Sequence, residues 1–186
     1  AAYARDFLLR PVLPAPLAIP TQLQKDLEVV KLRLLECRDP QQLDVWLHSL
    51  LRVAKLVNPA LPPAEAGALW SRIVAAPCVR ALHDFQQRWI DLFRAVGARD
   101  ARTMADLAAS LLDTTSDLYA DAHEYLVMSA MAGAIASGQR ARALEIWNRQ
   151  AARLSAEAAE PGFRLLRCHA QPDAACREAF RDYAED

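Results

Sequence analysis

The chain has 186 residues, of which 53% are hydrophobic and 24% are charged, which is the profile of a globular protein and not of a disordered one. Its formal net charge is −1 at pH 7, so it lacks the basic excess that proteins gripping nucleic acid usually carry. The longest uncharged stretch, residues 125–139, would form a helix about 22 Å long, too short for a bilayer core of about 30 Å. We therefore expect no nucleic-acid partner and no membrane span, and we interpret this stretch as a buried helix.

The N-terminal segment is rich in proline, with Pro11, Pro14, Pro16 and Pro20 among residues 11–20. Proline lacks the amide hydrogen and disfavours helical geometry at the residue before it. We expect residues 1–20 to form an extended arm that lies against the body of the protein or against a partner. Residues 21–186 are then expected to form a single all-helical domain.

From residue 21 onward, apolar side chains recur at helical spacing between proline-containing breaks. Breaks are expected at "RDPQQ" (residues 38–42), at "NPALPP" (residues 58–63) and at Pro77. A short helix before Pro77 should carry Leu69, Trp70, Ile73 and Val74. The helix after Pro77 should bury a stripe made of Leu82, Phe85, Trp89, Phe93 and Val96.

The second half of the chain continues in the same way. Gly97 is expected to close the preceding helix, and a helix with Met104, Leu107 and Leu111 should follow until "DTTSD" (residues 113–117). A long helix should then reach Ser137, and breaks at 160–162 and 171–173 should divide the remainder. No segment has the strict alternation of a half-buried strand. We expect an all-α fold of about eight or nine helices in stacked antiparallel hairpins.

Small side chains recur at helical spacing before the turn at Gly138, at Ala130, Gly133, Ala134 and Ser137. A glycine inside a helix costs up to about 1 kcal/mol relative to alanine, so Gly133 needs a compensating role. We predict that another helix packs closely against Gly133.

The segment around Gly138 resembles a tetratricopeptide repeat, a helical hairpin of about 34 residues. In that family a glycine at the turn is followed by a small residue five positions later and then by a large apolar one. Gly138, Ala143 and Trp147 match these positions, whereas the hairpin around Gly97 departs from them at Arg102. The resemblance covers roughly residues 80–155 and implies a concave array that grips a peptide. An irregular helical bundle, whose hairpins also need a turn and an apolar stripe, remains the alternative.

Cys168 and Cys176 flank a proline-containing turn that could bring their sulfur atoms within bonding reach. A disulfide between them is expected in an oxidising compartment such as the bacterial periplasm, and Cys37 with Cys78 could form a second one. In the bacterial cytoplasm all four would instead be reduced and mostly buried. We expect no metal site, because Cys168, His169 and Cys176 lack both a fourth ligand and the short spacing of structural zinc sites.

Arg142, Arg149 and Arg153 share one face of the helix after Gly138. Because a guanidinium binds carboxylates in bidentate fashion, we name these three arginines as candidate residues for binding an acidic peptide. Alternatively they are solvated or paired with nearby acids. The carboxylates near His123, which are Asp113, Asp117 and Asp121, are interpreted as acids that stabilise the start of a helix.

The sequence has no phosphate loop, dinucleotide fingerprint, nucleophile elbow or zincin motif, and we name no catalytic residues and no cofactor. We interpret the chain, whose Ala- and Arg-rich composition resembles a bacterial protein, as a non-enzymatic scaffold that binds a protein or peptide partner. One alternative is an accessory helical domain of a larger enzyme or of a transport or secretion protein. Another is a small all-α enzyme or ligand carrier with a pocket lined by Trp46, Trp70, Trp89 and Trp147. The oligomeric state stays open.

Overall fold

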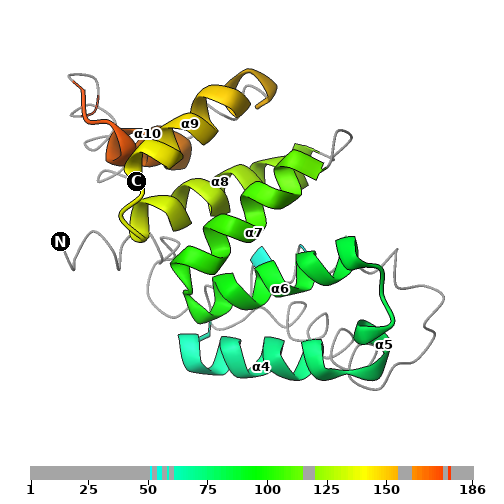
Figure 1. Ribbon diagram of the computed structural model, residues 1–186. Coiled ribbons are helices and arrows are strands. Elements are labelled where there is room, and N and C mark those ends of the chain that lie inside the picture. The colour runs from blue at the N-terminus through cyan, green and yellow to red at the C-terminus, as the bar shows by residue number, and fades with distance from the viewer. Residues whose placement is uncertain are drawn as a thin grey trace. The chain divides into compact units, whose positions relative to one another are not determined.

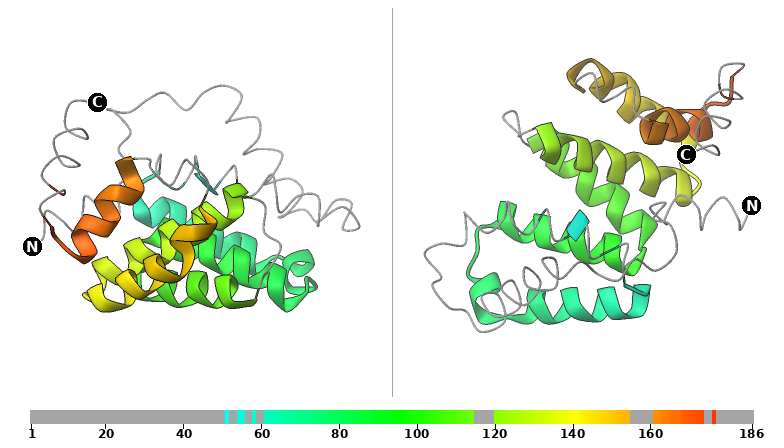
Figure 2. Two further views of the ribbon diagram at one scale, coloured as in Figure 1. Left: turned by 90° about the horizontal axis from the view of Figure 1, so that it is seen from above. Right: turned by 180° about the vertical axis from the view of Figure 1, so that it is seen from behind.

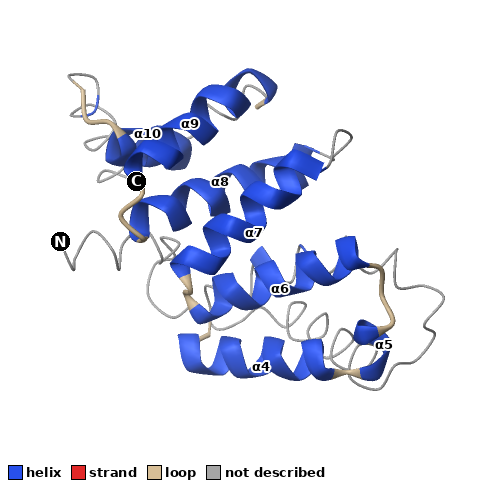
Figure 3. Ribbon diagram, viewed as in Figure 1, coloured by secondary structure: helices blue, strands red, loops and turns tan. Residues whose placement is uncertain are grey.

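The computed structural model describes residues 51, 54, 55, 58, 61–114, 120–154, 161–173 and 176. Seven α-helices and one 3₁₀ turn have their bounds among these residues, which contain no strand (Figure 3). The predicted all-α fold is thus confirmed for the described part of the chain. The proline-rich arm, the helix expected after residue 21 and the break at 38–42 lie outside the described residues. The total of eight or nine helices and the single domain over residues 21–186 therefore stay predictions.

The described chain divides into two compact units, one ending at Asp100 and the other beginning at Ala101. The first contains α4 (Pro63–Ala75) packed against α6 (Asp84–Ala98), with the short helix α5 (Pro77–Arg80) between them in the chain (Figure 1). Pro63 occupies the first turn of α4, where a missing amide hydrogen costs no hydrogen bond. Because Pro77 disfavours helical geometry before it, Ala76 is extended and α4 ends. The predicted break at Pro77 is confirmed.

An aromatic cluster fills the interface of α4 and α6. The ring centroid of Phe93 lies 5.4 Å from that of Trp70 and 5.8 Å from that of Trp89. All three side chains are buried, and tilted aromatic pairs at such distances are favourable. Trp70 and Trp89 therefore serve as core residues. Trp147 belongs to the other unit, and Trp46 lies outside the described residues.

Phe85 was expected on the buried stripe of α6, and that prediction was wrong, because its side chain is 40% exposed. The neighbouring Gln86 turns inward instead. Its Oε1 accepts a hydrogen bond from the backbone N–H of His83 at 3.1 Å, which satisfies an amide just before the helix. With Gln86 on the inner face, Trp89, Ile90 and Phe93 continue the stripe, and Phe85 lies to one side of it.

Gly97 does not close α6, contrary to the prediction from sequence. The helix continues to Ala98, and Arg99 adopts left-handed geometry with φ 56°. The backbone N–H of Asp100 then donates to the carbonyl of Ala95 at 2.9 Å, which completes a Schellman-type helix end. Gly97 is needed for close packing, because a Cβ there would lie 2.9 Å from both Asn58 Oδ1 and Trp70 Cδ1.

Arg99→Gly is expected to raise the free energy of unfolding by about 0.5–1 kcal/mol, because glycine adopts left-handed geometry without a clash at Cβ. Urea unfolding followed by circular dichroism measures the change. Arg99→Ala removes the same side chain but keeps Cβ, so it should give no gain. Equal stability of the two variants would contradict the idea that the backbone of Arg99 is strained.

The unit that begins at Ala101 is built around α8 (Ala120–Ala136), which packs on α7 (Ala101–Thr114), α9 (Arg140–Gln150) and α10 (Pro161–Ala170). Figure 1 shows α7 on one side of α8 and α9 on the other, and Figure 2 shows the same order from behind. The prediction of a buried helix here is confirmed, since most of its described side chains are buried. They include Leu126, Val127, Ala130, Met131, Ala134 and Ile135.

Gly133 lies where the backbones of α8 and α7 approach each other closely. A Cβ at this position would stand 2.6 Å from the carbonyl oxygen of Ala101 and 2.8 Å from the backbone nitrogen of Ala105. Both atoms belong to the backbone of α7, so they cannot move aside as a side chain could. The absence of a side chain at Gly133 thus sets the distance between the two helices.

The turn between α8 and α9 depends on Gly138, whose φ is +83°. The backbone N–H of Gln139 donates to the carbonyl of Ala134 at 2.7 Å, which ends α8 in a Schellman motif. Open space surrounds the position of a Cβ at Gly138, so its backbone conformation is what favours glycine.

The spacing after Gly138 predicts that Leu144, Trp147 and Leu154 anchor the following helix (α9), and of these three the structure buries Leu154 alone. Ala143 is fully buried, as close helix packing requires, but the large anchor is Ile146, whereas Leu144 and Trp147 are half-buried. The Trp147 ring lies 6.3 Å from the ring of Phe163 on α10. Trp147 therefore covers α10, while Ile146 enters the core of the unit.

Candidate functional site

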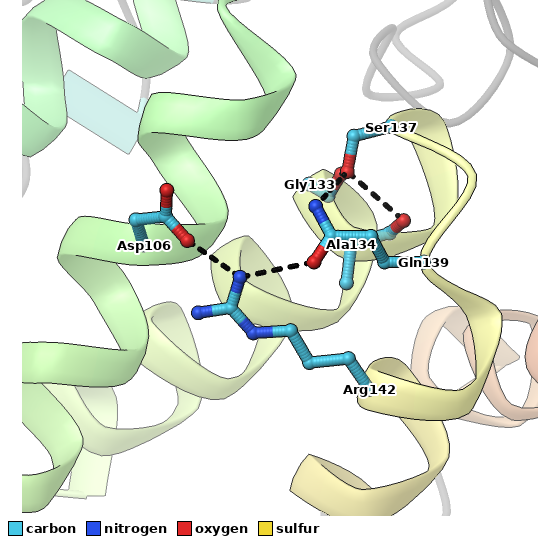
Figure 4. A network of polar contacts seen from close by, with 6 residues as sticks. All are labelled: Asp106, Gly133, Ala134, Ser137, Gln139 and Arg142. Carbon is cyan, nitrogen blue, oxygen red and sulfur yellow. Dashed lines mark hydrogen bonds and ion pairs between the residues drawn. The ribbon is translucent and has the colours of Figure 1, made fainter.

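Arg142, at the start of α9, is tied to both α7 and the end of α8 (Figure 4). Its Nη1 donates to Asp106 Oδ1 at 2.5 Å and to Gln139 Oε1 at 3.2 Å. Gln139 Nε2 in turn donates to Ser137 Oγ at 3.1 Å, and that hydroxyl donates to the carbonyl of Gly133 at 2.8 Å. Arg142 therefore belongs to a network that fixes the turn between α8 and α9.

Arg149 lies two helical turns further along α9 and is held more loosely. Its Nη1 stands 3.5 Å from Asp113 Oδ1 on α7, and its Nη2 stands 3.7 Å from Glu145 Oε1. Charge-assisted hydrogen bonds are about 2.7–2.9 Å long, so these are ion pairs without that geometry. The Arg149 side chain is 51% exposed, against 32% for Arg142.

The two bridges connect α7 and α9 across α8. Asp106 and Asp113 are two helical turns apart on α7, and Arg142 and Arg149 are the same distance apart on α9. We name the resulting surface the bridged face: Asp106, Asp113, Arg142, Glu145 and Arg149. Arg153, the third predicted arginine, follows at the end of the 3₁₀ turn Ala151–Arg153 and is exposed.

Asp113 is not at the start of a helix, so that part of the interpretation from sequence was wrong. α7 continues to Thr114, whose hydroxyl donates to the carbonyl of Ser110 at 2.9 Å. Asp113 thus lies in the last turn of α7, where the helix dipole disfavours a negative charge and Arg149 offsets it. Asp117 and the side chain of Asp121 lie outside the described residues.

His123 is buried and joins α8 to α9. Its Nε2 lies 2.9 Å from Gln150 Oε1, within hydrogen-bonding distance. Among the described residues, no group of three or more His, Cys, Asp or Glu side chains could hold a metal ion. The structure thus gives His123 a role in helix packing.

Cys168 and Cys176 form a disulfide with their Cα atoms 5.5 Å apart, and both side chains are buried. An ion pair of 2.9 Å between Arg167 and Asp173 closes the same turn. Cys78 is also disulfide-bonded, and Cys37, with which a second bridge was predicted, lies outside the described residues.

For protein secreted into a bacterial periplasm, we expect Cys168 and Cys176 to resist alkylation until a reductant is added. Loss of this bridge alone, as in a double variant with Cys168→Ser and Cys176→Ser, should cost about 2.5 kcal/mol of stability in the chain-entropy model, given the sequence separation of 8. Peptide mass spectrometry before and after reduction measures the labelling. Full labelling of both thiols without reductant would contradict the bridge.

His169 follows Cys168 in the chain, and among the residues that the structure describes its imidazole is the group whose pKa is shifted. Burial lowers the pKa of its imidazole below the ordinary value of 6.5, and the nearby positive charge of Arg140 lowers it further. The folded chain therefore favours neutral His169 more strongly than the unfolded chain does.

Because of His169, the free energy of unfolding is expected to decrease as the pH is lowered below about 6.5. Since its folded pKa lies below its unfolded pKa, the contribution is complete above about pH 6.5 and is lost as the pH falls through the folded value. His169→Gln should flatten the loss of melting temperature between about pH 7 and pH 5. Arg140→Gln removes the charge that is the smaller cause of the lowered pKa. Its loss of melting temperature should lie between those of the unmodified protein and His169→Gln. A slope in His169→Gln equal to that of the unmodified protein would disprove this.

Comparison of the chain with protein-family models, with curated proteins and with solved structures found no match. Within the described residues, no helix has the length and apolarity needed to cross a membrane.

The sequence singled out the arginines but missed their partners. Asp106 and Asp113 lie on another helix, and only the packing of α7 and α9 on α8 brings them near Arg142 and Arg149. The sequence did contain a signal for this pairing, because Asp106 and Asp113 have the same spacing as Arg142 and Arg149. Gln139 gave no signal, because its role depends on the geometry of the turn.

Proposed function

We propose that this chain is a non-enzymatic, TPR-like helical interaction domain that binds a protein partner at the bridged face. The observation that carries the proposal is the pair of Arg–Asp bridges that connect α7 and α9 over a buried helix. Helical-repeat proteins present such adjacent helices as rigid surfaces for peptides and partner helices.

The composition of α9 favours the same proposal. It buries only a narrow face, with Ala143 and Ile146 as its buried side chains. Arg140, Glu145 and Arg149 are exposed. Exposed charges of this kind contribute little to folding, about 0–1 kcal/mol for a surface ion pair. They can therefore serve recognition at small cost to stability.

Affinity capture from a native extract of the source organism, followed by reconstitution with the purified partner, tests this function. The immobilised chain should retain a protein saturably, and Arg149→Glu should lose at least about tenfold in affinity, equal to 1.4 kcal/mol. Arg72→Glu is the control, because Arg72 is exposed and, like Arg149, lies in the last turn of its helix, but belongs to α4 in the other unit. If no protein binds saturably, or if both variants bind equally well, the proposed function is wrong.

A further inference from the structure

We propose that the partner presents a carboxylate to Arg149, and that this carboxylate displaces Asp113 from the guanidinium. The inference rests on the proposed function and names its ligand as an acidic side chain on a protein segment. Arg142 stays bound to Asp106 and Gln139 during the exchange.

The difference between the two bridges indicates which arginine exchanges its partner. Arg142 has a short bond to Asp106 and a second bond to Gln139, and two-thirds of its side chain is covered. Arg149 has two ion pairs longer than a charge-assisted hydrogen bond, and half of its side chain is in solvent. An incoming carboxylate can therefore gain a bidentate geometry at Arg149 that neither Asp113 nor Glu145 now has.

The positions of the two charges along their helices set the cost of releasing Asp113. Asp113 lies in the last turn of α7, where the carbonyl end of the helix disfavours an anion. Arg149 lies in the last turn of α9, where the same effect favours a cation. Displacement leaves the Asp113 carboxylate without the cation that offsets the helix dipole, so the bidentate geometry gained at Arg149 has to exceed that cost.

Charge complementarity favours a protein segment over a polyanion. α9 and the 3₁₀ turn carry Arg140, Arg142, Arg149 and Arg153 but only one acid, Glu145. Glu145 and Asp113 nevertheless flank Arg149, so a run of phosphates laid across it would meet both carboxylates. A segment with spaced acidic side chains avoids that repulsion.

The test uses an acetylated peptide with a glutamate at every fourth position and alanine between, titrated against the full chain at low salt by fluorescence anisotropy. Arg149→Gln should weaken binding at least fivefold. Asp113→Asn should tighten binding about two- to fivefold, because the competing carboxylate is gone. Asp106→Asn, the matched change at the other bridge, should alter binding by less than twofold. Circular dichroism verifies that each variant is folded.

Three results would overturn the proposal. The first is that neither the unmodified chain nor Asp113→Asn binds the peptide detectably. The second is that Asp106→Asn tightens peptide binding but Asp113→Asn does not, and the third is that a single-stranded oligonucleotide binds more strongly than the peptide. If a captured partner depends on Arg149 but Asp113→Asn does not tighten the peptide, the exchange is wrong and the proposed function stands. If no partner is captured, the proposed function fails whatever the peptide does.

Discussion

Gly133→Leu is expected to lower the free energy of unfolding of the unit beginning at Ala101 by about 3 kcal/mol. Even the first added atom would stand 2.6 Å from the carbonyl oxygen of Ala101, so α7 and α8 would have to separate. Gly133→Ala should cost about 1–2 kcal/mol, although alanine is the better helix former. Urea unfolding monitored by circular dichroism measures both changes.

Gly67→Ala is the matched control for this effect. Gly67 also lies inside a helix, but its added Cβ would meet Ala98 Cβ at 3.4 Å, an ordinary contact. It should therefore be neutral or gain up to about 1 kcal/mol from helix propensity. If Gly133→Ala gained stability as Gly67→Ala does, Gly133 would not set the spacing of α7 and α8.

Asn58→Ala is expected to destabilise the unit ending at Asp100 by about 3 kcal/mol, because two buried hydrogen bonds are lost. Trp70 Nε1 donates to Asn58 Oδ1 at 2.6 Å, and Asn58 Nδ2 donates to the carbonyl of Phe93 at 3.1 Å. The variant leaves the indole N–H buried without its acceptor. The change is measured as a shift of the urea midpoint.

A double-mutant cycle with Trp70→Phe separates the hydrogen bond from packing. Once the indole N–H is removed, Asn58→Ala should cost about 1 kcal/mol less than it does beside Trp70. Strictly additive effects would show that Asn58 stabilises the unit by filling space alone.

The features that the sequence did predict follow from local chemistry. The break at Pro77, the turn at Gly138 and the burial of α8 are set by residues within one helix or turn, so spacing and residue type suffice. The features that it missed need a neighbouring helix. Nothing local to Gly97 shows that Asn58 and Trp70 occupy the space beside it.

The candidate site likewise has a part that the sequence predicts and a part that it does not. Helical spacing places Arg142 and Arg149 on one face, and this much is readable from the sequence. Which of the two is tied down depends on the distances to Asp106 and Asp113, and those depend on how α7 and α9 pack on α8. The sequence alone gives no reason to distinguish the two arginines, whereas in the structure Arg142 makes two hydrogen bonds and Arg149 makes two longer ion pairs.

The affinity of the reconstituted partner for a charge-swapped chain tests the central claim most directly. Arg149→Asp combined with Asp113→Arg keeps an ion pair between α7 and α9 but moves the positive charge from α9 to α7. We expect an unchanged melting temperature and a loss of at least about tenfold in affinity, equal to 1.4 kcal/mol. A swapped chain that binds the partner as tightly as the unmodified one would contradict recognition at Arg149.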